Sequence, residues 1–206
     1  MRPLGREAAQ ASQHTLPLGR EAAKGEPEGV SSGNKRRRLF FALWPDEETR
    51  HAIYRATGES VRRVGGRPVP AENWHLTLAF LGSRPESLLP ALCDAAGQLE
   101  PPGGTLGLER LGHFARARVL WLGPRDTPHD LRHFVDGLWN AIEPLGIERE
   151  RRAFAAHLTL ARKIHRLPCV AVEPVVWRYA GFSLVESVTD PRGARYEVLQ
   201  NWPAVK

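Results

Sequence analysis

The chain has 206 residues, of which 42% are hydrophobic, and a formal net charge of +6. This length and composition predict one domain with additional segments, or two small domains, with enough apolar residues for a core. No run of about 18 apolar residues is present, which excludes a membrane-spanning helix, and the amino-terminal segment predicts no secretory signal. Only two cysteines occur, Cys93 and Cys169, which is too few for a disulfide framework or a zinc site. We therefore expect a cytoplasmic protein.

Positive charge is concentrated near the amino terminus. The first 38 residues hold eight Lys or Arg and four Glu, whereas the other 168 hold 21 basic and 19 acidic residues. This near balance argues against a broad nucleic-acid-binding surface on the folded part. Because residues 1–37 are polar and lack aromatic side chains, we expect a disordered basic tail there, followed by a single two-lobed domain over 38–206. The run 35–38 is either a localisation or nucleic-acid patch or, as we favour, a solvated charge run.

The rest of the chain predicts strands alternating with helices. Short apolar or alternating runs predict strands, and apolar residues at intervals of three and four predict helices. The expected strands are 39–43, 74–81, 105–114, 118–122, 154–162, 177–189 and 195–199, and the expected helices are 45–64, 85–99 and 128–145. Gly82 is expected to end the second strand, and a turn at 190–193 is expected to pair the last two as a hairpin. This order favours an α+β fold of two similar halves packed face to face around a cleft.

One tetrapeptide occurs twice in the predicted strands. His75-Leu76-Thr77-Leu78 recurs 82 residues later as His157-Leu158-Thr159-Leu160. Because side chains alternate between the two faces of a strand, each copy presents a histidine and a threonine on one face and two leucines on the other. A structural duplication kept for packing is the alternative, but packing selects only the leucines. We interpret the two copies as a functional pair facing one cleft.

These side chains suit acid–base catalysis on a phosphate ester without a metal. An imidazole titrates at about pH 6.5, so one ring can be neutral and accept a proton while the other is protonated and donates one. The hydroxyls of Thr77 and Thr159 can donate hydrogen bonds to phosphoryl oxygens, on which negative charge grows in the transition state.

Three arginines could add positive charge to the cleft. Counting from His157 in steps of two places Ala161 on the histidine face, so Arg162 reaches the cleft only if the strand twists or ends first. Arg118 and Arg195 begin predicted strands, and each taken alone is more typical of the surface.

Other motifs indicate neither a metal site nor a cofactor site. His129 and His133 are four residues apart on a predicted helix, which is metal-ligand spacing, but no carboxylate or cysteine cluster completes a coordination shell. We interpret both as solvated. The sequence contains no Gly-x-Gly-x-x-Gly, no Gly-Lys-Ser/Thr and no nucleophilic serine elbow. We therefore expect no metal and no cofactor.

The repeats and the segments around them resemble a known family. Two His-x-Thr motifs about 80 residues apart resemble the two-histidine phosphoesterase superfamily. Closer similarity, to the bacterial RNA 2′,3′-cyclic phosphodiesterases, formerly described as 2′-5′ RNA ligases, is found in 38–42, 66–69, 75–82, 118–123, 157–162 and 195–196. It covers about residues 38–202.

The resemblance implies a bilobal α+β fold in which two antiparallel sheets face a central cleft, with helices outside. It also implies hydrolysis of RNA 2′,3′-cyclic phosphate ends to 2′-phosphomonoesters. By matching motif positions, His75 would be the proton donor to the departing 3′ oxygen and His157 the proton acceptor that activates water. Thr77 and Thr159 would hold the phosphate, and Arg162 matches an arginine often found after the second motif.

One departure is visible, since Ala156 stands where the family commonly has proline. It loosens the entry to the strand and leaves the chemistry intact. The expected partners are RNA ends or small cyclic-phosphate nucleotides, with no membrane, and we expect a monomer. Three alternatives remain open: action on a small cyclic nucleotide or an ADP-ribose cyclic phosphate, an RNA-binding module without turnover, and reversible 2′-5′ joining of RNA.

Overall fold

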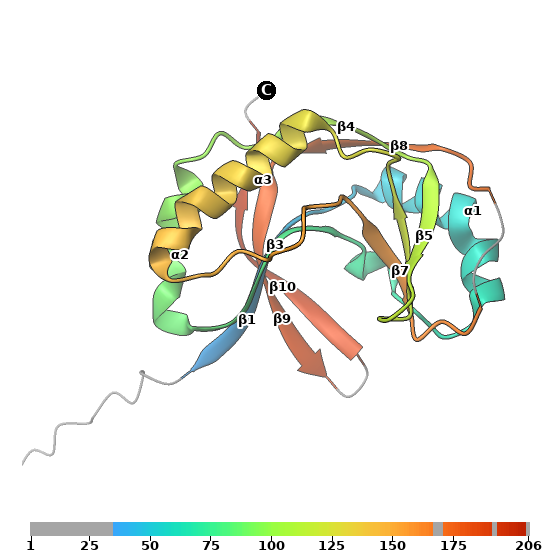
Figure 1. The fold of residues 1–206 in the computed structure, drawn as a ribbon, viewed down its shortest axis with the longest axis horizontal. Helices are drawn as coiled ribbons and strands as arrows, with labels where there is room; N and C mark the ends of the chain where they lie inside the picture. The colour runs from blue at the N-terminus through green and yellow to red at the C-terminus, as the bar shows by residue number, and fades with distance from the viewer. Residues whose placement is uncertain (1–34, 167–170, 191–192, 205–206) are drawn as a thin grey trace, which may run out of the picture. The chain divides into compact units, whose positions relative to one another are not determined.

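The computed structural model describes residues 35–166, 171–190 and 193–204 (Figure 1). Most of the predicted tail, the cysteine at position 169 and the centre of the predicted 190–193 turn lie outside these residues. No helix within the described ranges is long and apolar enough to cross a membrane.

The larger sheet has eight strands, and every pairing in it is antiparallel. Its strands are β1 (Arg36–Leu43), β2 (Arg67–Pro68), β3 (Leu76–Pro85), β5 (Arg110–Phe114), β6 (Val119–Gly123), β7 (Leu158–Arg162), β9 (Phe182–Asp190) and β10 (Gly193–Trp202). They run in the order β10-β9-β1-β3-β7-β6-β5, with β2 also paired to β7. Leu76 and Leu158 form the one pair between β3 and β7, so the sheet consists of two halves joined at a single point (Figure 1). The predicted α+β class with two antiparallel halves is confirmed.

A second sheet contains β4 (Gly103–Leu108) and β8 (Val175–Ala180). Two predictions are corrected here, because 105–114 and 177–189 were each expected to be one strand. Each run divides after its first part and continues in the larger sheet, as β5 and β9. The second division falls at Gly181, whose φ of 100° and close approach to the Trp202 carbonyl require a residue without a side chain.

Three helices pack onto this framework: α1 (Glu47–Val64), α2 (Leu89–Gly97) and α3 (His129–Ile142). Asp46 caps α1 by accepting a hydrogen bond from the Thr49 backbone N–H at 2.8 Å. α2 packs against α3, and α1 packs against β8. Buried residues from all three helices and both sheets form one main hydrophobic cluster. The predicted helix over 85–99 begins later than expected, because Glu86–Leu88 form a 3₁₀ turn first.

Strands β1 and β3 are both longer than the sequence predicts: β1 begins earlier, and β3 ends later. β3 continues through Gly82, which has a φ of 73°, and its extension pairs with β1 from Arg36 onwards. Arg37 bonds to Glu86 and Glu186, and its side chain is only 18% exposed. The interpretation of the basic run as wholly solvated is therefore wrong at Arg37, because two carboxylates from distant segments meet it.

Candidate active site

The two repeat histidines are held by the same local hydrogen bond. The Nδ1–H of His75 donates to the Asn73 carbonyl at 2.8 Å, and the Nδ1–H of His157 donates to the Ala155 carbonyl, also at 2.8 Å. A carbonyl oxygen can only accept, so Nδ1 carries the hydrogen in both rings. In the neutral form of each ring, Nε2 is therefore left with its lone pair to accept a proton.

The two repeats also share a backbone irregularity. The register of β3 against β1 passes from Thr77 to Ala79, skipping Leu78, and that of β7 against β6 passes from Thr159 to Ala161, skipping Leu160. An extra residue of this kind reverses the alternation of faces beyond it.

The shift in β7 changes the position of Arg162. Leu160 and Ala161 are consecutive buried residues, and Arg162 is exposed. The prediction that strict alternation places Ala161 on the histidine face is therefore wrong. The equivalent residue of β3 is Phe80, and both Phe80 and Arg162 line the hollow that contains His75.

His75 lies among three aromatic rings. Its ring centroid is 4.8 Å from that of Phe40, 5.3 Å from Trp44 and 4.9 Å from Tyr196. Burial is the main cause that lowers the pKa of His75 to about 4; the hydrogen bond to Asn73 opposes this shift, and the nearby Arg162 and His157 side chains add to it. The ring of His75 is therefore neutral at pH 7 in the free protein.

His157 is held by two other aromatic rings. Its centroid is 5.0 Å from that of Phe114, nearly perpendicular to it, and 6.4 Å from that of Trp121. The Trp121 ring covers Gly112 on the neighbouring strand so closely that a Cβ there would lie 2.0 Å from Trp121 Cζ2. The missing side chain at Gly112 therefore sets the position of Trp121 beside His157.

Two adjoining hollows contain the histidines. The first, called here the His75 hollow, has a volume of about 420 Å³ and is lined by Arg38, Phe40, His75, Thr77, Phe80, Arg162, Ser187, Ala194 and Tyr196. The second, called the His157 hollow, has about 340 Å³ and is lined by Thr77, Leu78, Ala79, Phe80, Phe114, Trp139, Arg149, Glu150, Arg152, Ala153, Phe154, Ala155 and His157. Thr77 and Phe80 line both, so the two histidines lie in neighbouring parts of one groove.

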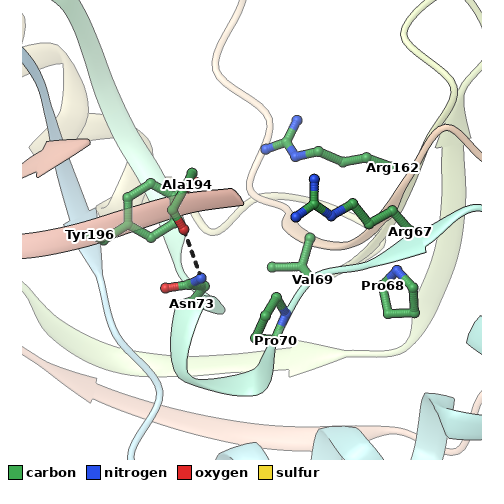
Figure 2. Close-up of a pocket in the computed structure, with 8 residues that line it drawn as sticks. All are labelled: Arg67, Pro68, Val69, Pro70, Asn73, Arg162, Ala194 and Tyr196. Atoms are coloured by element: carbon green, nitrogen blue, oxygen red, sulfur yellow. Dashed lines mark hydrogen bonds between the residues drawn. The ribbon is translucent and has the colours of Figure 1, made fainter. Parts of the chain in front are cut away.

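A smaller hollow of about 180 Å³ adjoins the His75 hollow and shares Arg162, Ala194 and Tyr196 with it (Figure 2). Arg67 and Arg162 are paired across β2 and β7, and Figure 2 shows their side chains lying close together and extending in the same direction. The Asn73 side-chain amide donates to the Ala194 carbonyl at 3.1 Å and links the loop before His75 to β10.

The other predicted residues lie in different places. Thr159 is half-buried opposite Trp121 and lines none of the three hollows. Arg118 points away from them, because its guanidinium donates to the carbonyls of Lys163 and Ile164 and contacts His165.

Arg195 lies between two residues of β10 that line the groove, Ala194 and Tyr196, so strand alternation places Arg195 on the opposite face.

Sequence reasoning missed Arg38, Arg67 and Tyr196. Arg38 lies two residues before Phe40 in β1, so strand alternation places both side chains on the same face, and both line the His75 hollow. This alternation could have been recognised in the sequence, but the interpretation of 35–38 as a solvated charge run did not extend the strand to Arg38. Arg67 and Tyr196 come from distant strands, and no local pattern in the sequence connects them to the histidines.

His129 and His133 do not belong to this groove. Both are exposed on α3, with parallel rings whose centroids are 6.3 Å apart. Within the part of the chain that the structure describes, no group of three or more His, Cys, Asp or Glu is placed to hold a metal ion.

The groove thus combines two anchored imidazoles, a threonine hydroxyl and arginine side chains. Each Nε2 is set to exchange a proton, and the hydroxyl and guanidinium groups are donors suited to phosphoryl oxygens. This set fits acid–base chemistry at a phosphate ester.

Comparisons with known proteins agree with this chemistry. The RNA 2′,3′-cyclic phosphodiesterase of Escherichia coli (strain K12) is 35% identical over 168 residues, which is 81% of this chain and 96% of that protein. The chain belongs to the LigT-like phosphoesterase family. The family model itself matches residues 43–121.

Further relatives of the LigT-like family support the same assignment. The RNA 2′,3′-cyclic phosphodiesterase of Thermus thermophilus is 36% identical over 180 residues, 80% of this chain and 89% of that protein. The crystal structure of E. coli LigT with 3′-AMP is similar with a TM-score of 0.74 at 33% identity, covering 84% of this chain and all of that one. The crystal structure of a T. thermophilus protein, TT0787, is similar with a TM-score of 0.67 at 31% identity, covering 81% and 97% of the two chains.

Proposed function

We propose that the protein hydrolyses RNA 2′,3′-cyclic phosphate ends to 2′-phosphomonoesters by acid–base catalysis without a metal. The observation that carries this proposal is the shared anchoring of His75 and His157, whose Nδ1–H groups both donate to a backbone carbonyl beside one groove. The activity named for the E. coli and T. thermophilus relatives, which are similar over most of this chain, supports the choice of substrate.

The proposed reaction is an in-line displacement at phosphorus. Nε2 of His157 takes a proton from water, and the water oxygen forms a new bond to phosphorus. The bond between phosphorus and the 3′ oxygen breaks on the opposite side, and protonated His75 gives its Nε2 proton to that oxygen. The products are a 2′-phosphomonoester and a free 3′ hydroxyl.

The phosphate is held by hydrogen-bond donors in this proposal. Thr77 lines both hollows and donates its hydroxyl to a phosphoryl oxygen. Arg162 supplies positive charge from the His75 side, where it lines two hollows. Thr159 has the equivalent position in the second repeat, and we propose that its hydroxyl also donates a hydrogen bond to the phosphate.

The donor role of His75 needs a source for its proton, since burial lowers its pKa to about 4 in the free protein. A bound phosphate brings negative charge next to the ring, and an adjacent opposite charge favours the protonated form. We infer that the substrate itself raises the pKa of His75, so the proton donor is formed in the complex.

The test is hydrolysis of an oligonucleotide with a 2′,3′-cyclic phosphate end in the presence of EDTA. Turnover should persist in EDTA, and mass analysis with mapping of the phosphate position should identify a 2′-phosphomonoester. Comparison of kcat/KM with a mononucleotide 2′,3′-cyclic phosphate and with an ADP-ribose cyclic phosphate distinguishes RNA ends from small substrates. Tight binding without any product would instead support an RNA-binding module.

The proposal also places the protein in the cytoplasm as a monomer. Two cysteines in 206 residues suit a reducing compartment. Cell fractionation and sedimentation of the purified chain test these two statements.

A further inference from the structure

A separate hollow lies on the face of the larger sheet opposite the catalytic groove. Leu111 of β5 packs on the main core, and Phe114 lines the His157 hollow, so strand alternation places His113 on the core side of β5. His113 lines a hollow of about 210 Å³, called here the Arg118 hollow. None of its lining residues lines the three hollows of the groove. They are His113, Ala115, Arg118, Ile164, His165 and Arg166.

Two strained backbone positions form the Arg118 hollow and are tied together. Arg118 and Lys163 have φ angles of 53° and 55°, and no other non-glycine residue that the structure describes has a positive φ. The Ile164 N–H donates to the Arg118 carbonyl at 3.0 Å. The His165 N–H donates to the Val64 carbonyl at the end of α1, also at 3.0 Å. Strain of this kind is concentrated at ligand sites, where the surrounding structure maintains it.

The ring of His165 is held with its hydrogen on Nε2. A guanidinium can only donate, so Nη2 of Arg118, at 2.8 Å, donates to Nδ1 of His165. The same guanidinium is fixed by the carbonyls of Ile164 and Lys163, at 3.0 Å and 3.3 Å. On another side the His165 ring packs on Gly65, where a Cβ would lie 3.3 Å from Cδ2. This tautomer is opposite to that of the two groove histidines, so Nε2 of His165 is an N–H donor and not a proton acceptor.

Positive charge and hydrogen-bond donors line the Arg118 hollow without a carboxylate. None of its two histidines and two arginines forms an ion pair within the part of the chain that the structure describes. Donors of this kind are suited to the oxygens of a phosphate. Small-ligand sites have roughly 300–1,000 Å³, and a water molecule takes up about 30 Å³. The 210 Å³ of this hollow therefore suits one phosphate group better than a whole nucleotide.

We propose that the Arg118 hollow binds one phosphate group. The Nε2–H of His165 and the guanidinium of Arg166 donate to its oxygens, and Arg118 holds His165 in the tautomer that donates. The phosphate is either free inorganic phosphate or a backbone phosphate of a bound RNA chain, since both present the same oxygens. This inference does not rest on the proposed function, because the hollow shares no lining residue with the groove.

NMR signals of the histidine Cε1–H groups test this site directly. Inorganic phosphate is added to the purified protein at constant pH and ionic strength, and each signal is assigned from the corresponding His→Gln variant. The signals of His113 and His165 should move along one saturable curve with a single Kd. Those of His129 and His133, the exposed pair on α3, are the internal control and should stay in place. Movement shared by all four signals without saturation would overturn the inference.

An arginine variant assigns the binding to the hollow. Arg166→Gln should raise the Kd read from the His165 signal about tenfold, the loss expected for a hydrogen bond to a charged group. Arg178→Gln, on the exposed side of β8, is the matched control and should keep the wild-type Kd. The same Kd in the wild type and both variants would contradict the assignment.

A second titration distinguishes the two sources of phosphate. It uses an RNA oligonucleotide with a 3′ hydroxyl in place of the cyclic end. If a backbone phosphate occupies the hollow, the oligonucleotide should move the His113 and His165 signals at a lower concentration than inorganic phosphate does, and Arg166→Gln should weaken both ligands. If free phosphate is the ligand, the oligonucleotide should leave these signals in place. Signals that neither ligand moves would overturn the inference.

Discussion

Leu76 and Leu158 face each other as the only pair that joins β3 to β7, one residue after each histidine. Both side chains are fully buried in the main core. The packing of these two leucines therefore sets how the two halves of the sheet, and with them the two imidazoles, lie relative to each other.

The first prediction concerns this junction. Leu158→Ala should lower the free energy of unfolding by about 2–5 kcal/mol, because it leaves a cavity in the core, and should reduce kcat by misaligning His157. Urea denaturation and steady-state kinetics measure the two effects. Val198→Ala, at a site that is 43% exposed in β10, is the control and should change stability by no more than about 0.5 kcal/mol. Equal free energies of unfolding in the two variants would show that the Leu76–Leu158 junction does not contribute this stability.

The second prediction concerns Gly112 beneath Trp121. In Gly112→Ala, the new Cβ would lie 2.0 Å from Trp121 Cζ2, so the indole must move. We expect kcat to fall at least about tenfold, since a small misplacement of a catalytic group has effects of this size. Gly107→Ala in β4, where nothing lies within 4 Å of the new Cβ, is the matched control. If the Gly112→Ala enzyme had the same kcat as the control, the position of Trp121 would not affect catalysis by His157.

The third prediction follows from the burial of His75. The unfolded chain binds a proton at this ring with a pKa of 6.5 and the folded chain only at about 4, so the unfolded state takes up more protons between these values. The contribution of His75 to stability is therefore full above pH 6.5 and is lost as the pH falls to 4, by about 3 kcal/mol. Urea denaturation of the wild type and of His75→Gln across this range should show the steeper decline in the wild type. Parallel curves would mean that His75 is not buried in its neutral form.

The fourth prediction concerns the proton donor in the complex. Bound phosphate should raise the pKa of His75, so the alkaline limb of kcat should lie at higher pH than the alkaline limb of kcat/KM. Steady-state rates from pH 4 to pH 10 give both profiles, whose limbs belong to the coupled pair of rings. Coincident alkaline limbs would exclude protonation of His75 by the substrate.

The sequence was sufficient to predict the class of fold and the paired histidines, because both depend on local patterns. The alternation of His-Leu-Thr-Leu determines which side chains share a face, and the structure keeps that arrangement from His75 to Thr77. Strict alternation of side chains between the two faces fails at Leu78 and Leu160, where each strand has one residue more than the neighbouring strand with which it pairs. An irregularity of this kind depends on the partner strand, so counting along one strand misplaced Arg162.

Long-range contacts account for the remaining differences. The runs 105–114 and 177–189 look continuous in the sequence, but each changes sheets, because β4 and β8 pair with each other and not with the strands that follow them. Arg67 reaches the site only through its pairing with Arg162, and Tyr196 only through the position of β10. These placements follow from the assembled sheet and have no signature in the residues themselves.

The central claim is that His75 and His157 act on one phosphorus atom in a single step, and a double-mutant cycle tests it most directly. His75→Ala and His157→Ala should each lower kcat for hydrolysis of the cyclic-phosphate oligonucleotide by about 10²–10⁴. The double variant should lose little more than the worse of the two, since residues that act as a unit are strongly non-additive. Losses that simply multiply in the double variant, or a rate that survives His157→Ala, would contradict the account.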